Sequence, residues 1–172
     1  MEQIYQPTTK AELKQLVDDN NVYLGEIDVS LIADMSRLFY ESERKLFSGI
    51  ETWDVSNVEN MSNMFKGAEN FNGDLSCWDV SNVKDMNYMF AGATNFNGDL
   101  SCWDVSSVEN MESMFLGAEN FNSDISGWNV TNVRDMRFMF LGAKNFRCDI
   151  SKWDMSKVEN EGFMFYNTIR IS

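Results

Sequence analysis

Histidine is absent from this chain of 172 residues. Its absence removes the commonest general base and the commonest transition-metal ligand of proteins. The sequence also lacks a phosphate-cradling glycine loop and a nucleophile placed beside a base, which are the usual signatures of catalytic centres. We therefore expect a protein that is not an enzyme, with no catalytic residue, no metal site and no cofactor.

Proline and cysteine are also scarce. The single proline is Pro7, and the three cysteines, Cys77, Cys102 and Cys148, form no C-x-x-C pair. This odd count argues against a disulfide framework and against structural zinc, so we expect reduced thiols. The N-terminal stretch lacks the apolar core of a signal peptide, and no apolar run reaches transmembrane length. The chain as written is therefore predicted to be cytoplasmic, without membrane insertion.

Basic residues are outnumbered: 14 Lys and Arg stand against 27 Asp and Glu, which gives a net charge of −13. Nucleic acids and anionic membranes require a positive protein surface, so neither is an expected partner. The acidic excess is compatible with a basic protein partner, with a bound cation, or with simple solubility.

Tryptophan, in contrast, is placed with strict regularity. The five tryptophans are Trp53, Trp78, Trp103, Trp128 and Trp153, each 25 residues after the last. A fixed period of this length is typical of a solenoid. Inside each repeat, Trp-Asp-Val alternates as a strand does, and Met86, Met89, Phe90 and Ala93 have the spacing of one helix face. Residues that favour helix N-caps precede that segment. They are Asn60, Asp85, Asn110, Asp135 and Asn160.

These patterns predict an α/β repeat solenoid: a curved, leucine-rich-repeat-like array with one short parallel strand and one short helix in each 25-residue coil. Strands pair about 4.8 Å apart whereas helices pack about 8–10 Å apart, so the strand sheet is expected on the concave face. Each Trp is expected to point into a core filled by Met and Phe. A second register, with the strand at residues 71–75, remains open.

Four segments are predicted. Residues 1–27 form an N-terminal cap with an extended segment and a helix over 10–17, which Thr8 or Thr9 caps. Residues 28–52 are a degenerate first repeat, whose charged loop 41–45 is expected to be solvated. Residues 53–152 are four regular repeats. Residues 153–172 are a modified last repeat and C-terminal cap, in which Glu161 replaces a Met. Both ends are thus expected to close the array.

Charged residues form columns when the repeats are aligned. One column alternates in sign, which predicts attraction between neighbouring coils. It consists of Glu59, Lys84, Glu109, Arg134 and Glu159. Another column is uniformly acidic and consists of Asp74, Asp99, Asp124 and Asp149. Stacked carboxylates can bind Ca²⁺, but hydrogen bonds to nearby turn amides are the favoured interpretation.

The repeated phrase W-D-V-S-N-V-x-x-M-x-x-M-F-x-G-A-x-x-F-N-x-D-[IL]-S resembles the 25-residue repeat of the BspA-like leucine-rich-repeat family, a bacterial family of surface proteins and lipoproteins. The resemblance covers residues 28–166. It implies a curved solenoid, a location at the cell surface, and a role in protein–protein interaction or adhesion. It implies no catalytic residue.

We therefore predict a non-enzymatic interaction or adhesion module that binds a protein partner through its acidic concave face, which favours a basic partner. The alternative is an acidic decoy that inhibits a nucleic-acid-binding protein, although the alternating column argues against it because a decoy gains from uniform charge. The predicted contact residues are the residue after each Trp and the hydroxyl residue two positions on. They are Asp54, Asp79, Asp104, Asn129 and Asp154, with Ser56, Ser81, Ser106, Thr131 and Ser156.

Overall fold

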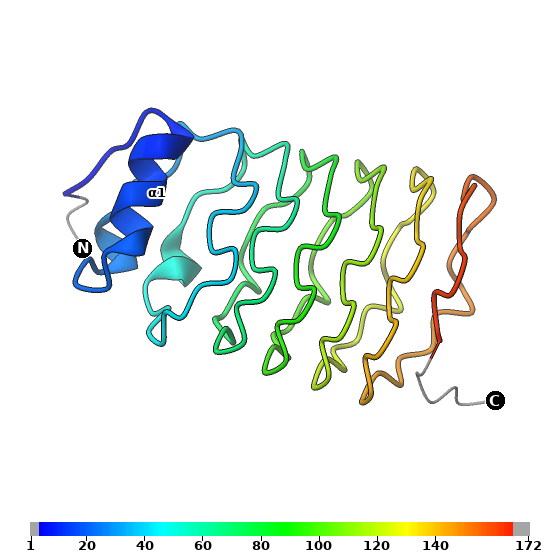
Figure 1. Cartoon of the computed structure of the whole chain (residues 1–172). Coiled ribbons are helices and arrows are strands. Elements are labelled where there is room, and N and C mark those ends of the chain that lie inside the picture. The colour runs from blue at the N-terminus through cyan, green and yellow to red at the C-terminus, as the bar shows by residue number, and fades with distance from the viewer. Residues whose placement is uncertain (1–3, 167–172) are drawn as a thin grey trace.

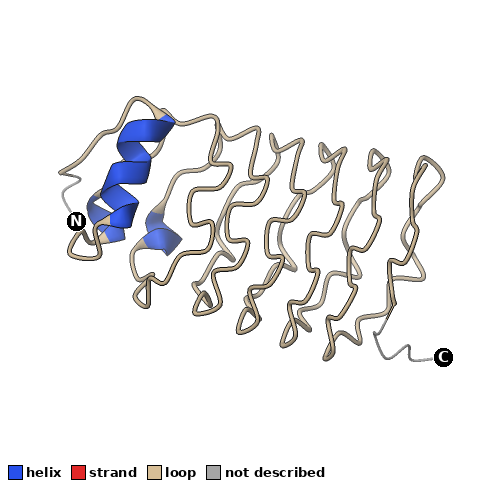
Figure 2. Cartoon of the chain, in the orientation of Figure 1, coloured by secondary structure: helices blue, strands red, loops and turns tan. Residues whose placement is uncertain are grey.

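The computed structural model describes residues 4–166. Its helices are α1 (Lys10–Asp18) and two short 3-10 turns, η1 (Leu24–Glu26) and η2 (Ile50–Thr52). Beyond η1 the chain winds into coils that stack side by side, with α1 at one end of the stack and the last coil at the other (Figure 1). Apart from η2, the described coils consist of turns and extended segments, without a β-strand (Figure 2).

The expected α/β solenoid is therefore wrong. Residues 53–166 contain neither the strand nor the helix that the pattern predicted for each coil. The coils are instead joined by isolated parallel bridges, one between each pair of neighbouring coils. The bridged residues are Asp34, Asn60, Asp85, Asn110, Asp135 and Asn160, of which the last five are the predicted helix N-caps. The predicted curvature rested on a mismatch between strand and helix spacing, and it loses its basis when both elements are absent from these residues.

The Met-Phe segment is not helical because its backbone amides alternate between two kinds of partner. Amides at every second position donate to carbonyls of the next coil. Those between them bond within their own coil, either to the side chain of the residue two positions back, as Ser62 does, or to the carbonyl three positions back, as Met64 and Lys66 do. In the first regular repeat, the donors to the next coil are Met61, Asn63, Phe65 and Gly67, with N–O distances of 2.7–2.9 Å. An α-helix would require the same amides to bond to residue i−4, so the two arrangements exclude each other.

A recurring left-handed residue sets this backbone path. Asn63 has φ = 57° and Gly67 has φ = 71°. A right-handed helix cannot continue through such a residue, and side chains other than glycine seldom adopt this conformation. The residues equivalent to Asn63 in later coils are Tyr88, Ser113, Phe138 and Phe163. The spacing of apolar residues carries no information on φ, so the spacing alone could not distinguish this segment from a helix.

The Trp-Asp-Val segment alternates as predicted, with Trp78 and Val80 buried and Asp79 exposed. It is not a strand because side chains make its bonds to the previous coil. The Trp78 indole donates to the carbonyl of Ile50 at 3.0 Å, and the Asn82 side chain donates to the carbonyl of Ser56 at 2.8 Å. The second register, 71–75, is not a strand either.

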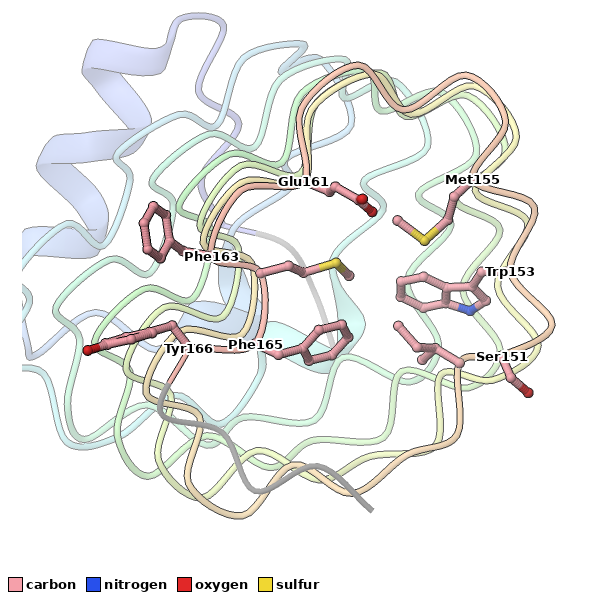
Figure 3. Close-up of a pocket in the computed structure, with 9 residues that line it drawn as sticks. Ser151, Trp153, Met155, Glu161, Phe163, Phe165 and Tyr166 are labelled. Carbon is pink, nitrogen blue, oxygen red and sulfur yellow. The ribbon is translucent and has the colours of Figure 1, made fainter. Parts of the chain in front are cut away.

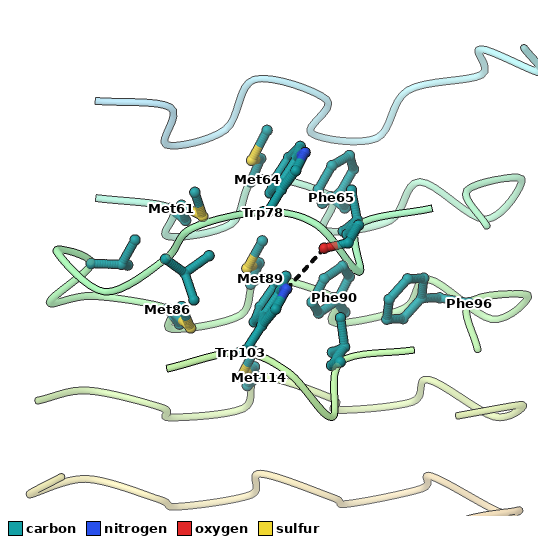
Figure 4. Close-up of a cluster of buried hydrophobic side chains, with 14 of the residues drawn as sticks. Met61, Met64, Phe65, Trp78, Met86, Met89, Phe90, Phe96, Trp103 and Met114 are labelled. Carbon is teal, nitrogen blue, oxygen red and sulfur yellow. Dashed lines mark hydrogen bonds between the residues drawn. The ribbon is translucent and has the colours of Figure 1, made fainter. Parts of the chain in front are cut away.

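The core is a set of side-chain ladders that run along the stack (Figure 4). The predicted inward position of Trp is confirmed, since every Trp is buried. Trp103 and Trp128 stack with ring centroids 6.4 Å apart, and Phe65 and Phe90 stack at 5.6 Å. The apolar stripes of the four Met-Phe segments at 61–68, 86–93, 111–118 and 136–143 are also buried. Burying whole columns of aromatic and thioether side chains supplies the main driving force of this fold.

The N-terminal helix forms as expected. Thr9 is the N-cap of α1, and it exchanges hydrogen bonds with Glu12 in a capping box. Leu13 and Val17 bury one face of the helix. Lys10 pairs with Asp34 of the first coil at 3.2 Å, which fixes α1 on this end of the stack. The predicted C-terminal cap extends beyond the described residues.

The prediction that the charged loop 41–45 is solvated is wrong for Arg44. Its side chain is 5% exposed rather than solvated. The guanidinium donates to the carbonyls of Val17, Asp19 and Val22 at 2.6–3.2 Å. Because Val17 lies in the last turn of α1 and Asp19 and Val22 follow it, Arg44 ties the helix and the chain after it to the first coil.

Candidate functional site

The residues predicted to bind a partner form one row along the stack, which we call the first acidic row. Its carboxylates belong to Asp54, Asp79, Asp104 and Asp154, and the exposed Asn129 occupies the same position in its coil. The tryptophans that directly precede these residues stack from coil to coil with ring centroids 6.2–6.4 Å apart, so neighbouring members of the row lie in adjacent coils. The row lies on extended backbone and not on the concave sheet that was expected, since the described coils contain no sheet.

Each member of the row closes a local turn. Its Oδ1 atom accepts the amide N–H of the Ser or Thr two residues on, at 3.0–3.2 Å. The hydroxyls of Ser56 and Thr131 also donate to that oxygen, at 2.7 and 2.8 Å. The structure therefore brings the ten predicted residues together as five pairs. In these pairs the hydroxyl residue orients the carboxylate.

A second acidic row runs beside the first and consists of Asp74, Asp99, Asp124 and Asp149. These carboxylates also accept the amide of a Ser two residues on, at 2.9–3.0 Å. The expected hydrogen bonds to turn amides are thus confirmed. Within residues 4–166 no three Asp, Glu or Cys side chains converge as a metal site would require. In each coil a four-residue turn joins the two rows; one such turn is closed by the Trp78 amide and the Leu75 carbonyl at 3.1 Å.

The two rows keep their negative charge. Hydrogen bonds from the Ser81 hydroxyl and amide lower the pKa of Asp79, and those from Ser106 lower the pKa of Asp104. Neighbouring carboxylates act in the opposite direction, because Asp79 raises the pKa of Asp104. In the described part of the chain, no Lys or Arg forms an ion pair with Asp54, Asp79 or Asp104. The hydrogen bonds therefore favour the ionised form of Asp79 and Asp104, and charge repulsion between neighbours opposes it at Asp99 and Asp104.

The alternating column lies elsewhere on the coils. Lys84 pairs with Glu59 at 2.7 Å, and Arg134 pairs with Glu159 at 3.3 Å. The predicted attraction between neighbouring coils is confirmed for these two boundaries. Because every partner is more than half exposed, the column stabilises the stack only weakly.

The sequence prediction missed the C-terminal end of the stack as a possible site. A pocket of about 600 Å³ opens there between the two sides of the last coil (Figure 3). Trp153, Met155, Glu161 and Met164 are among its lining residues, and Phe163 and Tyr166 are more than half exposed beside it. The break in the Met column at Glu161 was visible in the sequence, but only the stacking of coils shows that Glu161 lines this pocket.

Two segments of the chain, residues 2–118 and 77–172, match one family model, whose description is "Mycoplasma protein of unknown function, DUF285". Together they span almost the whole sequence. The chain belongs to the DUF285 family. No curated protein and no solved structure matches this DUF285 protein. Since the family description states no activity, the expected adhesion role, the acidic binding face and the resemblance to the BspA-like family stay predictions. Within residues 4–166 no helix is both long and apolar enough to cross a bilayer.

Proposed function

We propose that this DUF285 protein is a non-enzymatic interaction module that binds a basic protein partner through its first acidic row. The observation that carries the proposal is the row itself. Its carboxylates recur in register from coil to coil, and hydrogen bonds to the following Ser residues hold them in one orientation. A surface that is already ordered loses little conformational entropy on binding.

Electrostatics favours a basic partner. Aligned carboxylates repel one another, and Asp79 accordingly raises the pKa of Asp104. Lys or Arg side chains between them would relieve the repulsion. Complementary charge mainly sets the association rate and the choice of partner. Each exposed pair contributes little by itself. Binding should therefore require several members of the row together and should weaken as salt is added.

The test neutralises three members of the row in one variant: Asp79→Asn, Asp104→Asn and Asp154→Asn. Asn129 already closes the same turn with Thr131 at 3.2 Å, so the substitutions should preserve the backbone. A fluorescent lysine-rich peptide serves as the probe, and its affinity is measured by anisotropy at low and at physiological ionic strength. We expect the triple variant to bind it about tenfold more weakly at low salt.

The matched control removes the same number of charges elsewhere, through Glu43→Gln, Glu69→Gln and Glu109→Gln. All three positions are exposed, and none forms an ion pair in the described structure. This variant should keep most of the affinity. If both variants lose affinity equally, net charge alone attracts the peptide and the first acidic row is not a binding site.

A further inference from the structure

The repeat that begins at Trp128 departs from the others in the first acidic row. The other regular repeats and the last one have Asp, an apolar residue and Ser at these three positions, whereas this repeat has Asn129, Val130 and Thr131. The change from Asp to Asn removes a negative charge, so the binding of a basic partner does not account for it. Asn-Val-Thr is, however, the acceptor triplet of N-glycosylation, in which Asn is followed by any residue except Pro and then by Ser or Thr.

The side chain of Asn129 is exposed and is held in one orientation. Its Oδ1 atom accepts the Thr131 amide at 3.2 Å and the Thr131 hydroxyl at 2.8 Å. Its Nδ2 atom, to which a sugar would be joined, has no acceptor among the described residues. The carbonyl oxygen therefore anchors the side chain, while the amide nitrogen faces solvent.

The surroundings of Asn129 leave room for a sugar. Trp128 is 4% exposed and Val130 is 1% exposed, so the residues on both sides of Asn129 point into the core. In an extended segment successive side chains point to opposite faces, which directs Asn129 away from the core. A sugar on Nδ2 would thus displace no buried side chain. It would lie beside Asp104 and Asp154 of the neighbouring coils, whose carboxylates can accept hydrogen bonds from its hydroxyls.

A second triplet, at residues 60–62, has the same sequence pattern but a different setting. Asn60 is half-buried, and isolated bridges join it to the coils on both sides. The Met61 amide also donates to the carbonyl of Asp85 in the next coil at 2.9 Å. By contrast, no backbone hydrogen bond links residues 129–131 to a neighbouring coil in the part of the chain that the structure describes. An enzyme that must fit the triplet into its own site therefore reaches residues 129–131 without opening the stack, whereas Asn60 requires local unfolding.

We propose that Asn129 is an N-glycosylation site. A glycosyltransferase joins C1 of a sugar to Nδ2 of Asn129 while the bond between C1 and a phosphate leaving group breaks. The phosphate departs with the bonding electron pair and Nδ2 releases one proton, so the step needs no oxidant or reductant. The donor is a phosphate-activated sugar, either a nucleotide sugar or a lipid-linked oligosaccharide. The proposal does not rest on the proposed function, since it does not require the first acidic row to bind a partner.

The first test is mass spectrometry of the protein isolated from its own cells. We expect a sugar on the proteolytic peptide that contains Asn129 and none on the peptide that contains Asn60. A single hexose would identify a nucleotide sugar as the donor, and a longer glycan would identify a lipid-linked oligosaccharide. The proposal is overturned if Asn129 is unmodified, or if the sugar is found on other residues instead.

Three variants expressed in the same cells separate recognition of the triplet from loss of structure. Thr131→Ser keeps the triplet and should keep the sugar, whereas Thr131→Ala removes the hydroxyl and should abolish the modification. Asn129→Asp removes the acceptor nitrogen and restores the residue of the other repeats. This variant should be unmodified and should fold as the native protein does, because Asp104 closes the same turn with Ser106 at 3.0 Å. A sugar that persists in Thr131→Ala would show that the triplet is not recognised and would contradict the proposal.

The third test compares the folded protein with peptides. A soluble N-glycosyltransferase that recognises this triplet is supplied with UDP-glucose and with either the full-length protein or two synthetic peptides, which copy residues 57–65 and 126–134. Both peptides should accept glucose. In the folded protein, Asn129 should react at least on the order of tenfold faster than Asn60, because only Asn60 depends on local opening. Equal rates at the two positions, or a folded protein that does not react at Asn129, would rule out the exposed geometry as the basis of the site.

Discussion

The indole Nε1–H of Trp103 donates a hydrogen bond to the backbone carbonyl of Leu75 at 2.9 Å. The bond is buried and joins one coil to the turn that precedes the Trp of the coil before it (Figure 4). The other four tryptophans make the same bond, at 2.8–3.1 Å. These bonds join the Trp-Asp-Val segments of neighbouring coils, as backbone hydrogen bonds join the strands of a sheet. They explain why each repeat requires Trp, because other large apolar residues could fill the space but could not donate this bond.

The replacement Trp103→Phe tests this role. Phe would keep an aromatic ring in the stack, but it would remove the buried indole bond between the two coils and leave a small void, so that the Leu75 carbonyl would keep only the Trp78 amide as a donor. We expect the free energy of unfolding to fall by about 2–4 kcal/mol, as measured by urea denaturation. Met111→Leu, a volume-conserving change in the same core, should cost less than about 1.5 kcal/mol. Equal costs for the two variants would show that the indole bond contributes nothing beyond packing.

Lys84→Glu tests the alternating column. The variant replaces the 2.7 Å pair with Glu59 by a repulsive contact, and it also places like charge beside Glu109. We expect a lower melting temperature at low ionic strength. In about 1 M salt, where the screening length is about 3 Å, the difference from the native protein should narrow. Calorimetry at the two salt concentrations checks this, and a difference that does not respond to salt would rule out the electrostatic explanation.

The sequence predicted side-chain positions better than it predicted the backbone. The Met and Phe stripe, the inward Trp and a helix cap at Thr8 or Thr9 could be predicted because burial and capping depend on residue type and spacing. The predicted cap column does cap: Asn60 accepts the Ser62 amide at 2.9 Å. However, it caps a turn, because the left-handed Asn63 three residues later prevents a helix.

In the candidate site, too, the features that depend on neighbouring residues could be predicted, whereas those that depend on distant segments could not. Its ten residues pair within their coils as local turn chemistry requires, and the sequence contained that information. The burial of Arg44 and the pocket that Glu161 lines depend on which segments meet in space. A short stretch of sequence does not show which distant segments come into contact, and the wrong prediction of strands and helices placed those segments incorrectly.

Ser113 is a position where substitution should stabilise the protein. It has φ = 55°, and its buried hydroxyl has no hydrogen-bond partner among the described residues. Ser113→Gly removes both the strain of the left-handed backbone and the buried hydroxyl, but it adds flexibility to the unfolded chain. We expect the free energy of unfolding to rise by about 1–2 kcal/mol in total. Ser113→Ala removes only the hydroxyl and should gain less, whereas the β-branched Ser113→Val should destabilise. Urea denaturation of the three variants provides the order, and an alanine variant as stable as the glycine variant would contradict the strain at this position.

Asp85 should destabilise the folded protein at neutral pH. Burial raises the pKa of this carboxyl, and Glu112 acts in the same direction, against a hydrogen bond from the Asn87 amide. Because the folded pKa is the higher one, the unfolded state releases this proton first. The penalty is therefore absent below the unfolded pKa of about 3.9 and grows as the pH rises through the folded pKa.

Asp85→Asn should consequently raise the melting temperature at pH 7, and the gain should vanish near about pH 3, where Asp85 is protonated in both states. Asn fits the position, since Asn60 and Asn110 close the same turn in neighbouring coils at 2.9 and 3.0 Å. Asp135→Asn is the matched control, and it should lower the melting temperature. Asp135 pairs with Arg137 at 2.9 Å, and neutralising Asp135 removes that ion pair. Thermal unfolding from pH 3 to pH 8 measures both variants. A gain for Asp85→Asn that stays constant across this range would show that turn geometry, and not the buried charge, sets the stability at this position.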